Sequence, residues 1–115
     1  MATLAELARR HSVLDEQRIA HLQGLTGCWG LLADLSFSDL VLYAPTADGP
    51  GAPMVLLGHV RPTTGTTLYR ADLVGQVYGP ERRPTVVEAL DSAKIVSGVV
   101  PVGTDRHINL IAIPV

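Results

Sequence analysis

The spacing of apolar residues changes near Leu35, and this change most constrains what the chain can fold into. Before Leu35, apolar residues recur three and four positions apart, which is typical of helices packed on a core. After it, short aliphatic and aromatic runs end at Gly- or Pro-rich turns, which is typical of strands. Since 115 residues is the length of one domain, we predict a single α+β domain over residues 1–115 with its helices first.

Two capping-box sequences predict where the N-terminal helices begin. In Thr3-Leu4-Ala5-Glu6 and in Ser12-Val13-Leu14-Asp15, a hydroxyl and a carboxylate can satisfy the first backbone amides of a helix reciprocally. The second helix is expected over about Asp15 to Leu32. Three glycines fall in its last part: Gly24, Gly27 and Gly30. Each costs about 1 kcal/mol relative to alanine, so they indicate either close packing or a break in the helix.

The rest of the chain shows four runs typical of strands and one further helix. Phe37 to Tyr43 and Met54 to Arg61 flank a loop rich in Gly and Pro, which predicts a hairpin. Pro84 suits the first position of a helix over Thr85 to Ala93. The remaining expected strands are residues 99–102 and 107–115, with a short extended piece at 66–70. Residues 71–83 show no clear pattern.

Composition and charge exclude several classes of protein. With 47% apolar and 17% charged residues the chain can bury a core, and a net charge of -2 argues against nucleic acid as a partner. No window of eighteen residues lacks a charge, so we expect no membrane span. The opening MATLAELARR lacks the apolar stretch of a secretory signal, so a cytoplasmic location is expected. Cys28, the single cysteine, allows no internal disulfide.

The last predicted strand runs to the final residue, Val115, with no polar tail after it. An unpaired apolar strand at an edge favours aggregation, and natural proteins usually protect such edges. We therefore expect this chain to be the N-terminal piece of a longer protein.

Four short segments, in this order, carry a resemblance to a known family. They are Leu31-Leu32-Ala33-Asp34-Leu35-Ser36-Phe37-Ser38-Asp39; Arg61-Pro62 with Thr64-Gly65 and Thr67; Asp72-Leu73-Val74-Gly75; and Ile113-Pro114-Val115. The chain resembles the N-terminal GAF-like sensor domain of actinobacterial cytosolic sensor histidine kinases of the PdtaS type. The resemblance spans nearly the whole chain, and its two N-terminal helices stand where that family has them.

The resemblance implies an antiparallel sheet flanked by helices, followed in the parent protein by a PAS-like domain and a histidine kinase core. Such kinases autophosphorylate and pass the phosphoryl group to a response regulator. The phospho-acceptor histidine and the motifs for ATP and Mg would lie in that core, and nothing in this chain matches them. The fragment is therefore expected to regulate rather than to catalyse, and to need no cofactor.

The residues themselves predict neither a catalytic centre nor a metal site. The four histidines, His11, His21, His59 and His107, form no pair at ligand spacing. Cys28 lies in an apolar helical stretch, where a thiol is expected to pack as a small hydrophobe. No Gly-rich phosphate loop with its lysine is present. An independent small enzyme on this fold is thus the least favoured alternative.

An anionic small molecule, such as a nucleotide, is the ligand that the arginines favour. Four of them fall in the central region: Arg61, Arg70, Arg82 and Arg83. Arginine's planar fork binds phosphates and carboxylates bidentately. His59 stands two residues before Arg61 in a predicted strand, so both are expected on one face. We propose His59, Arg61 and Arg70 as binding residues; the alternative is that these arginines are solvated surface charge.

The second helix predicts a homodimer contact. Leu22, Leu25 and Trp29 make it apolar on more than one side, so it is either buried or pairs with another helix. The alternative is one stripe packed on the sheet with no partner. Two functions follow from these patterns: a sensory module that shifts the packing of its sheet and helices on binding, or a ligand-free module for dimerisation and scaffolding.

Overall fold

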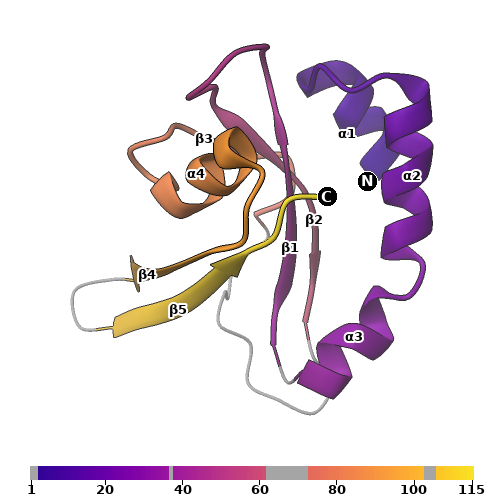
Figure 1. Cartoon of the computed structure of the whole chain (residues 1–115). Helices are drawn as coiled ribbons and strands as arrows, with labels where there is room; N and C mark the ends of the chain where they lie inside the picture. The colour runs from indigo at the N-terminus through magenta and orange to yellow at the C-terminus, as the bar shows by residue number, and fades with distance from the viewer. Residues whose placement is uncertain (1–2, 37, 62–72, 103–105) are drawn as a thin grey trace.

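The computed structural model describes residues 3–36, 38–61, 73–102 and 106–115 and confirms an α+β fold with helices at the N-terminus. Its elements in chain order are α1 (Leu4–His11), α2 (Glu16–Thr26), α3 (Trp29–Ser36), β1 (Leu40–Pro45), β2 (Met54–Val60), β3 (Val77–Tyr78), α4 (Pro84–Ser92), β4 (Val96–Val102) and β5 (Arg106–Ala112). Figure 1 shows α1, α2 and α3 on one side of β1 and β2, and α4 with β4 and β5 on the other.

All strand pairs in the described residues are antiparallel, as the resemblance implied. One sheet has the order β1-β2-β3, and β4 pairs with β5 in a second. The predicted hairpin is therefore confirmed, although β1 begins at Leu40 instead of Phe37. Helix α3 ends at Ser36, and beyond it the Ser38 amide donates to the Ala33 carbonyl at 3.2 Å. A register shift follows Leu42, which pairs with Gly58 while Tyr43 pairs with Leu56.

Strand β2 has a buried residue at four successive positions, Met54 to Leu57, because both of its faces are covered. Alternate side chains of a strand point to opposite faces. Val55 and Leu57 join Leu42 and Ala44 of β1 in the core beneath the N-terminal helices. Met54 packs with Val86 and Val87 of α4 on the opposite face. The sheet is therefore the middle layer, between the N-terminal helices and α4.

The first predicted capping box is present and the second is not. The Glu6 amide donates to Thr3 Oγ1 at 3.2 Å, and the Thr3 amide donates to Glu6 Oε2 at 3.4 Å. In the second sequence, Asp15 is the N-cap of α2 and accepts from the Arg18 amide at 2.8 Å. Ser12 ends α1 instead, and its hydroxyl donates to the Ala8 carbonyl at 2.6 Å. Because α1 continues to His11, Ser12 cannot begin the next helix.

The prediction of one continuous helix over Asp15 to Leu32 is wrong, because the helix is interrupted between α2 and α3 at Gly27 and Cys28. Of the two explanations for the glycines, the break is the one that the structure shows. A side chain built at Gly24 or at Gly30 would meet no described atom within 4 Å, so neither glycine marks a close contact there.

The C-terminal half follows the prediction with shifted boundaries. Helix α4 begins at Pro84 as expected, and it ends before Ala93, which has a left-handed backbone with φ of 55°. β4 begins at Val96 rather than at residue 99. β5 ends at Ala112, before Pro114, which has no amide to donate to a partner strand. The predicted piece 66–70 lies outside the described residues, and the described part of 71–83 includes β3.

Gly98 of β4 sits so close to α4 that its substitution should destabilise the fold. An added Cβ would collide with Thr85 Oγ1 and lie 3.3 Å from the Thr85 Cβ. We expect Gly98→Ala to lower the free energy of unfolding in urea by about 1–3 kcal/mol, and less in a Thr85→Ala background. Gly30→Ala is the control, and there the open space predicts a gain of up to about 1 kcal/mol. Equal stability of Gly98→Ala and the wild type would contradict the close contact.

Candidate functional site

Of the three residues predicted to bind an anion, His59 has the best-defined surroundings. Its Nε2 atom is 2.8 Å from Asp39 Oδ2, and the two side chains retain only 4% and 3% of their exposure. Arg61 follows β2 and is exposed. Arg70 lies outside the described residues. A shared site of His59, Arg61 and Arg70 therefore stays a prediction.

Asp39 is a site residue that the sequence analysis missed. It lies between α3 and β1, where no periodic pattern marks it. Strand pairing supplies the signal, because Val41 pairs with His59. Asp39 stands two residues before Val41 and so faces the same side of the sheet as His59. A buried pair of this kind fixes the chain after α3 to the end of β2.

Helix α3 is attached to β2 at its other end by Trp29. This side chain is 6% exposed and belongs to the core under the N-terminal helices. A Cβ on Gly58 would lie 3.7 Å from Trp29 Cζ3, so the indole rests directly over the glycine of β2. Gly58 and His59 are neighbours in β2, so Trp29 at the start of α3 and Asp39, which follows the end of α3 at Ser36, contact adjacent residues of one strand.

The three residues predicted to form a dimer contact lie on the sheet side of the helices. Leu22 is 7% exposed, Trp29 is similarly buried, and Leu25 is partly buried against the same core. Contacts within the chain thus account for all three, as the alternative interpretation expected. A different face remains exposed, with Leu31, Leu32 and Leu35 at 63%, 44% and 69%. Pairing of two chains stays a prediction.

Two of the central arginines meet on one aromatic ring. The guanidinium carbons of Arg82 and Arg83 lie 5.0 and 4.2 Å from the ring centroid of Tyr78. Arg83 Nε donates to the Tyr43 hydroxyl at 3.2 Å, and the rings of Tyr43 and Tyr78 meet edge to face. Sequence reasoning noted these arginines but not the tyrosine, because residues 71–83 showed no pattern.

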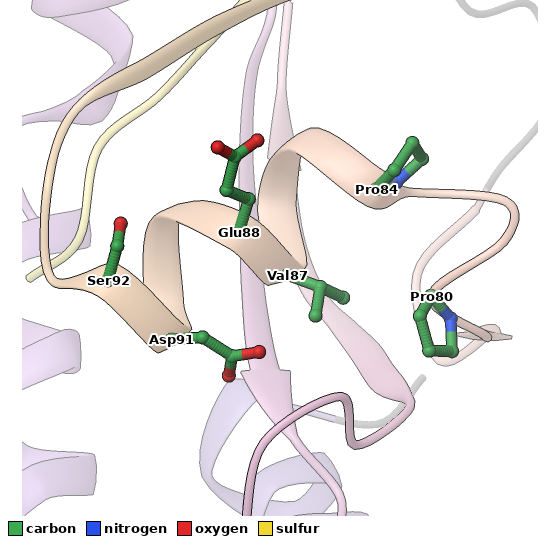
Figure 2. A pocket seen from close by; sticks show the side chains of 6 residues that line it. All are labelled: Pro80, Pro84, Val87, Glu88, Asp91 and Ser92. Carbon is green, nitrogen blue, oxygen red and sulfur yellow. The ribbon is translucent and has the colours of Figure 1, made fainter.

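A shallow hollow of about 480 Å³ lies beside α4. Figure 2 shows its lining, which is Pro80, Pro84, Val87, Glu88, Asp91 and Ser92. The carboxylate of Asp91 accepts a hydrogen bond of 3.0 Å from the Gly51 amide, which joins α4 to the β1–β2 loop. Two carboxylates at this hollow disfavour an anionic ligand within it.

Within residues 3–36, 38–61, 73–102 and 106–115, no three His, Cys, Asp or Glu side chains cluster as a metal site would require. Cys28 is exposed, and its thiol donates to the Leu25 carbonyl at 3.4 Å, so the expected packing role is wrong. Cys28 lies in the break between α2 and α3. No helix among the described residues has the length and apolar character needed to span a membrane.

The hydrogen bond between Arg9 and Glu16 shifts the pKa of both side chains. It lowers the pKa of the Glu16 carboxyl and raises that of the Arg9 guanidinium, with Nε and Oε1 2.7 Å apart. Both side chains are more than half exposed, so the pair joins α1 to α2 but adds little stability.

The layered α+β fold, with its N-terminal helices attached to a central strand, is shared with a solved sensor region, which places this chain in the class of sensor-type domains. A solved structure titled "Sensor region of a sensor histidine kinase" superimposes with a TM-score of 0.73 and 31% identity, covering 99% of this chain and 43% of that one. The sequence profile described as "Histidine kinase PdtaS, GAF domain" matches residues 4–115. The chain belongs to this PdtaS GAF-domain family.

Two curated relatives support the assignment. The chain is 36% identical over 98 residues to "Sensor histidine kinase PdtaS" of Mycolicibacterium smegmatis (strain ATCC 700084 / mc(2)155), and 38% identical over 86 residues to that of Mycobacterium tuberculosis (strain ATCC 25618 / H37Rv). These matches cover 85% and 75% of this chain but only 19% and 17% of the relatives. The chain therefore spans less than a fifth of the length of the relatives.

Removing the Asp39 carboxylate should destabilise the attachment of α3 to β2. Asp39→Ala leaves the buried His59 without this partner, and we expect the free energy of unfolding to fall by about 1–3 kcal/mol. Asp39→Asn keeps a hydrogen-bonding group and should lose less. Glu16→Ala breaks an exposed pair and serves as the control, with the smallest change of the three. Urea unfolding measures all three, and equal losses for Asp39→Ala and Glu16→Ala would contradict a structural role for the buried pair.

Proposed function

We propose that this domain is the sensory input module of a sensor histidine kinase and signals by a shift in packing. A ligand or a partner contact would favour one arrangement of the sheet and the N-terminal helices, and the PAS domain and kinase core that follow would respond to that preference. A ligand can shift such an equilibrium only by its difference in affinity for the two arrangements. Anionic small molecules bound near His59, Arg61 and Arg70 are the proposed ligands.

The observation that carries this proposal is the attachment of α3 to two adjacent residues of β2. Trp29 packs on Gly58 at one end, and Asp39 holds His59 at the other. A change in the position or twist of this part of β2 therefore acts on the start of α3 and on the residue Asp39 that follows it. Interfaces packed this closely change between discrete arrangements rather than deforming continuously, which suits a switch.

The activity of the whole protein belongs to the same proposal. We propose that it is a cytoplasmic kinase that binds ATP and Mg in its kinase core, autophosphorylates, and transfers the phosphoryl group to a response regulator. The support for this proposal comes from the family to which the chain belongs and from the names of its relatives. The domain described here would supply regulation without a catalytic residue of its own.

Autophosphorylation of the full-length kinase tests the role of the α3–β2 contact. Trp29→Leu removes the indole over Gly58 while keeping an apolar side chain, and we expect the autophosphorylation rate to change several-fold at an unchanged KM for ATP. Gln17→Ala, at an exposed position of α2, is the control. A folded Trp29→Leu protein with the wild-type rate would refute transmission through this contact. A parent chain that does not autophosphorylate would refute the kinase assignment itself.

A ligand-free dimerisation module is the second candidate, favoured by the three exposed leucines of α3. Surface leucines are common singly, but three within five residues form a patch that a partner would cover. Sedimentation velocity of the chain should then show a dimer at tens of micromolar, and Leu35→Ser should weaken it. A monomer throughout that range would exclude pairing through α3, while leaving the sensory proposal unaffected.

A further inference from the structure

The side chains that immediately precede α4 are basic, whereas the side chains at the start of a helix are usually acidic. Acidic side chains normally stabilise the first turn, because the unpaired amides there carry partial positive charge. The first turn of α4 has no acidic residue, and its N-cap, Arg83, makes no side-chain cap. Arg82 stands immediately before it. Two arginines and the positive end of a helix therefore occupy one region.

Ion pairing within the described residues does not neutralise these two arginines. Neither guanidinium forms an ion pair with a described carboxylate. Glu81, the nearest acidic residue in sequence, turns its carboxylate toward Gly79 instead. Like charges held near one another repel, and the repulsion is relieved only by an anion or by solvent.

Tyr78 fixes the two guanidinium groups in place. The ring is 2% exposed and both groups lie over it, so they are ordered by cation–π contacts and not by a carboxylate. Arg83 Nε donates to the Tyr43 hydroxyl, and Arg83 Nη1 donates to the Arg82 carbonyl. Arg82 makes no side-chain hydrogen bond within the described part of the chain. Its five N–H donors are thus held in position and available for a ligand.

We propose that Arg82, with Arg83 as a second fixed charge, binds the oxyanion of a phosphate group at the start of α4. A planar guanidinium fork matches two phosphate oxygens, and ordering by Tyr78 reduces the entropy lost on binding. The site is separate from His59, Arg61 and Arg70. The binding of phosphate at this site does not depend on the proposed sensory function, whereas a role of the site in signalling rests on that function.

Titration with inorganic phosphate, followed by amide chemical shifts of the chain at constant ionic strength, tests the site. We expect saturable shifts centred on residues 78–86. Arg82→Gln should weaken binding by about tenfold, the loss of one charge-assisted contact. Arg10→Gln, an exposed arginine of α1, removes the same charge and should leave the affinity within about twofold. Arg83→Lys keeps the charge but loses the Nε contact with Tyr43, and should bind more weakly than the wild type.

Three results would overturn the proposal: no saturable shift with phosphate, equal weakening by Arg82→Gln and Arg10→Gln, or shifts centred on Arg61. Melting temperatures of the variants establish that each is folded. Ribose 5-phosphate in place of phosphate separates the two sources of the group, since tighter binding indicates a phosphate carried on an organic molecule. Binding that leaves autophosphorylation of the full-length kinase unchanged would keep the site and remove only its role in signalling.

Discussion

Burial of β2 on both faces is the constraint on which the rest of the structure depends. Four successive buried residues, Met54 to Leu57, require apolar layers on two sides, and no single amphipathic helix can supply both. The N-terminal helices cover one face and α4 covers the other (Figure 1). The strand is consequently the element that every layer contacts. A movement of the helices on one face of the sheet therefore acts on a strand that is also packed against the opposite face.

Much of this arrangement can be read from the sequence, because it rests on local signals. The capping box at Thr3, the turn residues of the β1–β2 loop and Pro84 each fix an element boundary by backbone chemistry. Errors arose where two local signals competed. Ser12 fits a helix start, but α1 runs into it, and the apolar pattern across Gly27 continues although the backbone breaks there. Periodicity reports which side chains are buried and does not report whether one helix or two present them.

The candidate sites were harder to predict, since their partners are distant in sequence. His59 was identifiable as a polar residue in an apolar strand, whereas Asp39 is found only once the register of β1 against β2 is known. Arg82 and Arg83 were noted in the sequence as basic residues. The Tyr78 ring that they contact belongs to a strand of two residues, which is too short to show a hydrophobic pattern. Leu22 and Trp29 were predicted to contact a second chain, and tertiary packing gives them a core role within this chain that the helix alone could not reveal.

Helix α3, which carries the exposed leucines, and helix α4, which follows basic residues, lie on opposite sides of β1 and β2 (Figure 1). Tyr78, under the arginines, pairs with Met54 at the beginning of β2, and Trp29 rests on Gly58 near its end. The contacts between the two helices therefore run through one strand. Continuity of contact alone does not establish coupling, which also requires an element with two arrangements that both sites bias. Trp29 at the start of α3 and Asp39 beyond its end both contact β2, so a second arrangement of this segment would have to exchange both contacts.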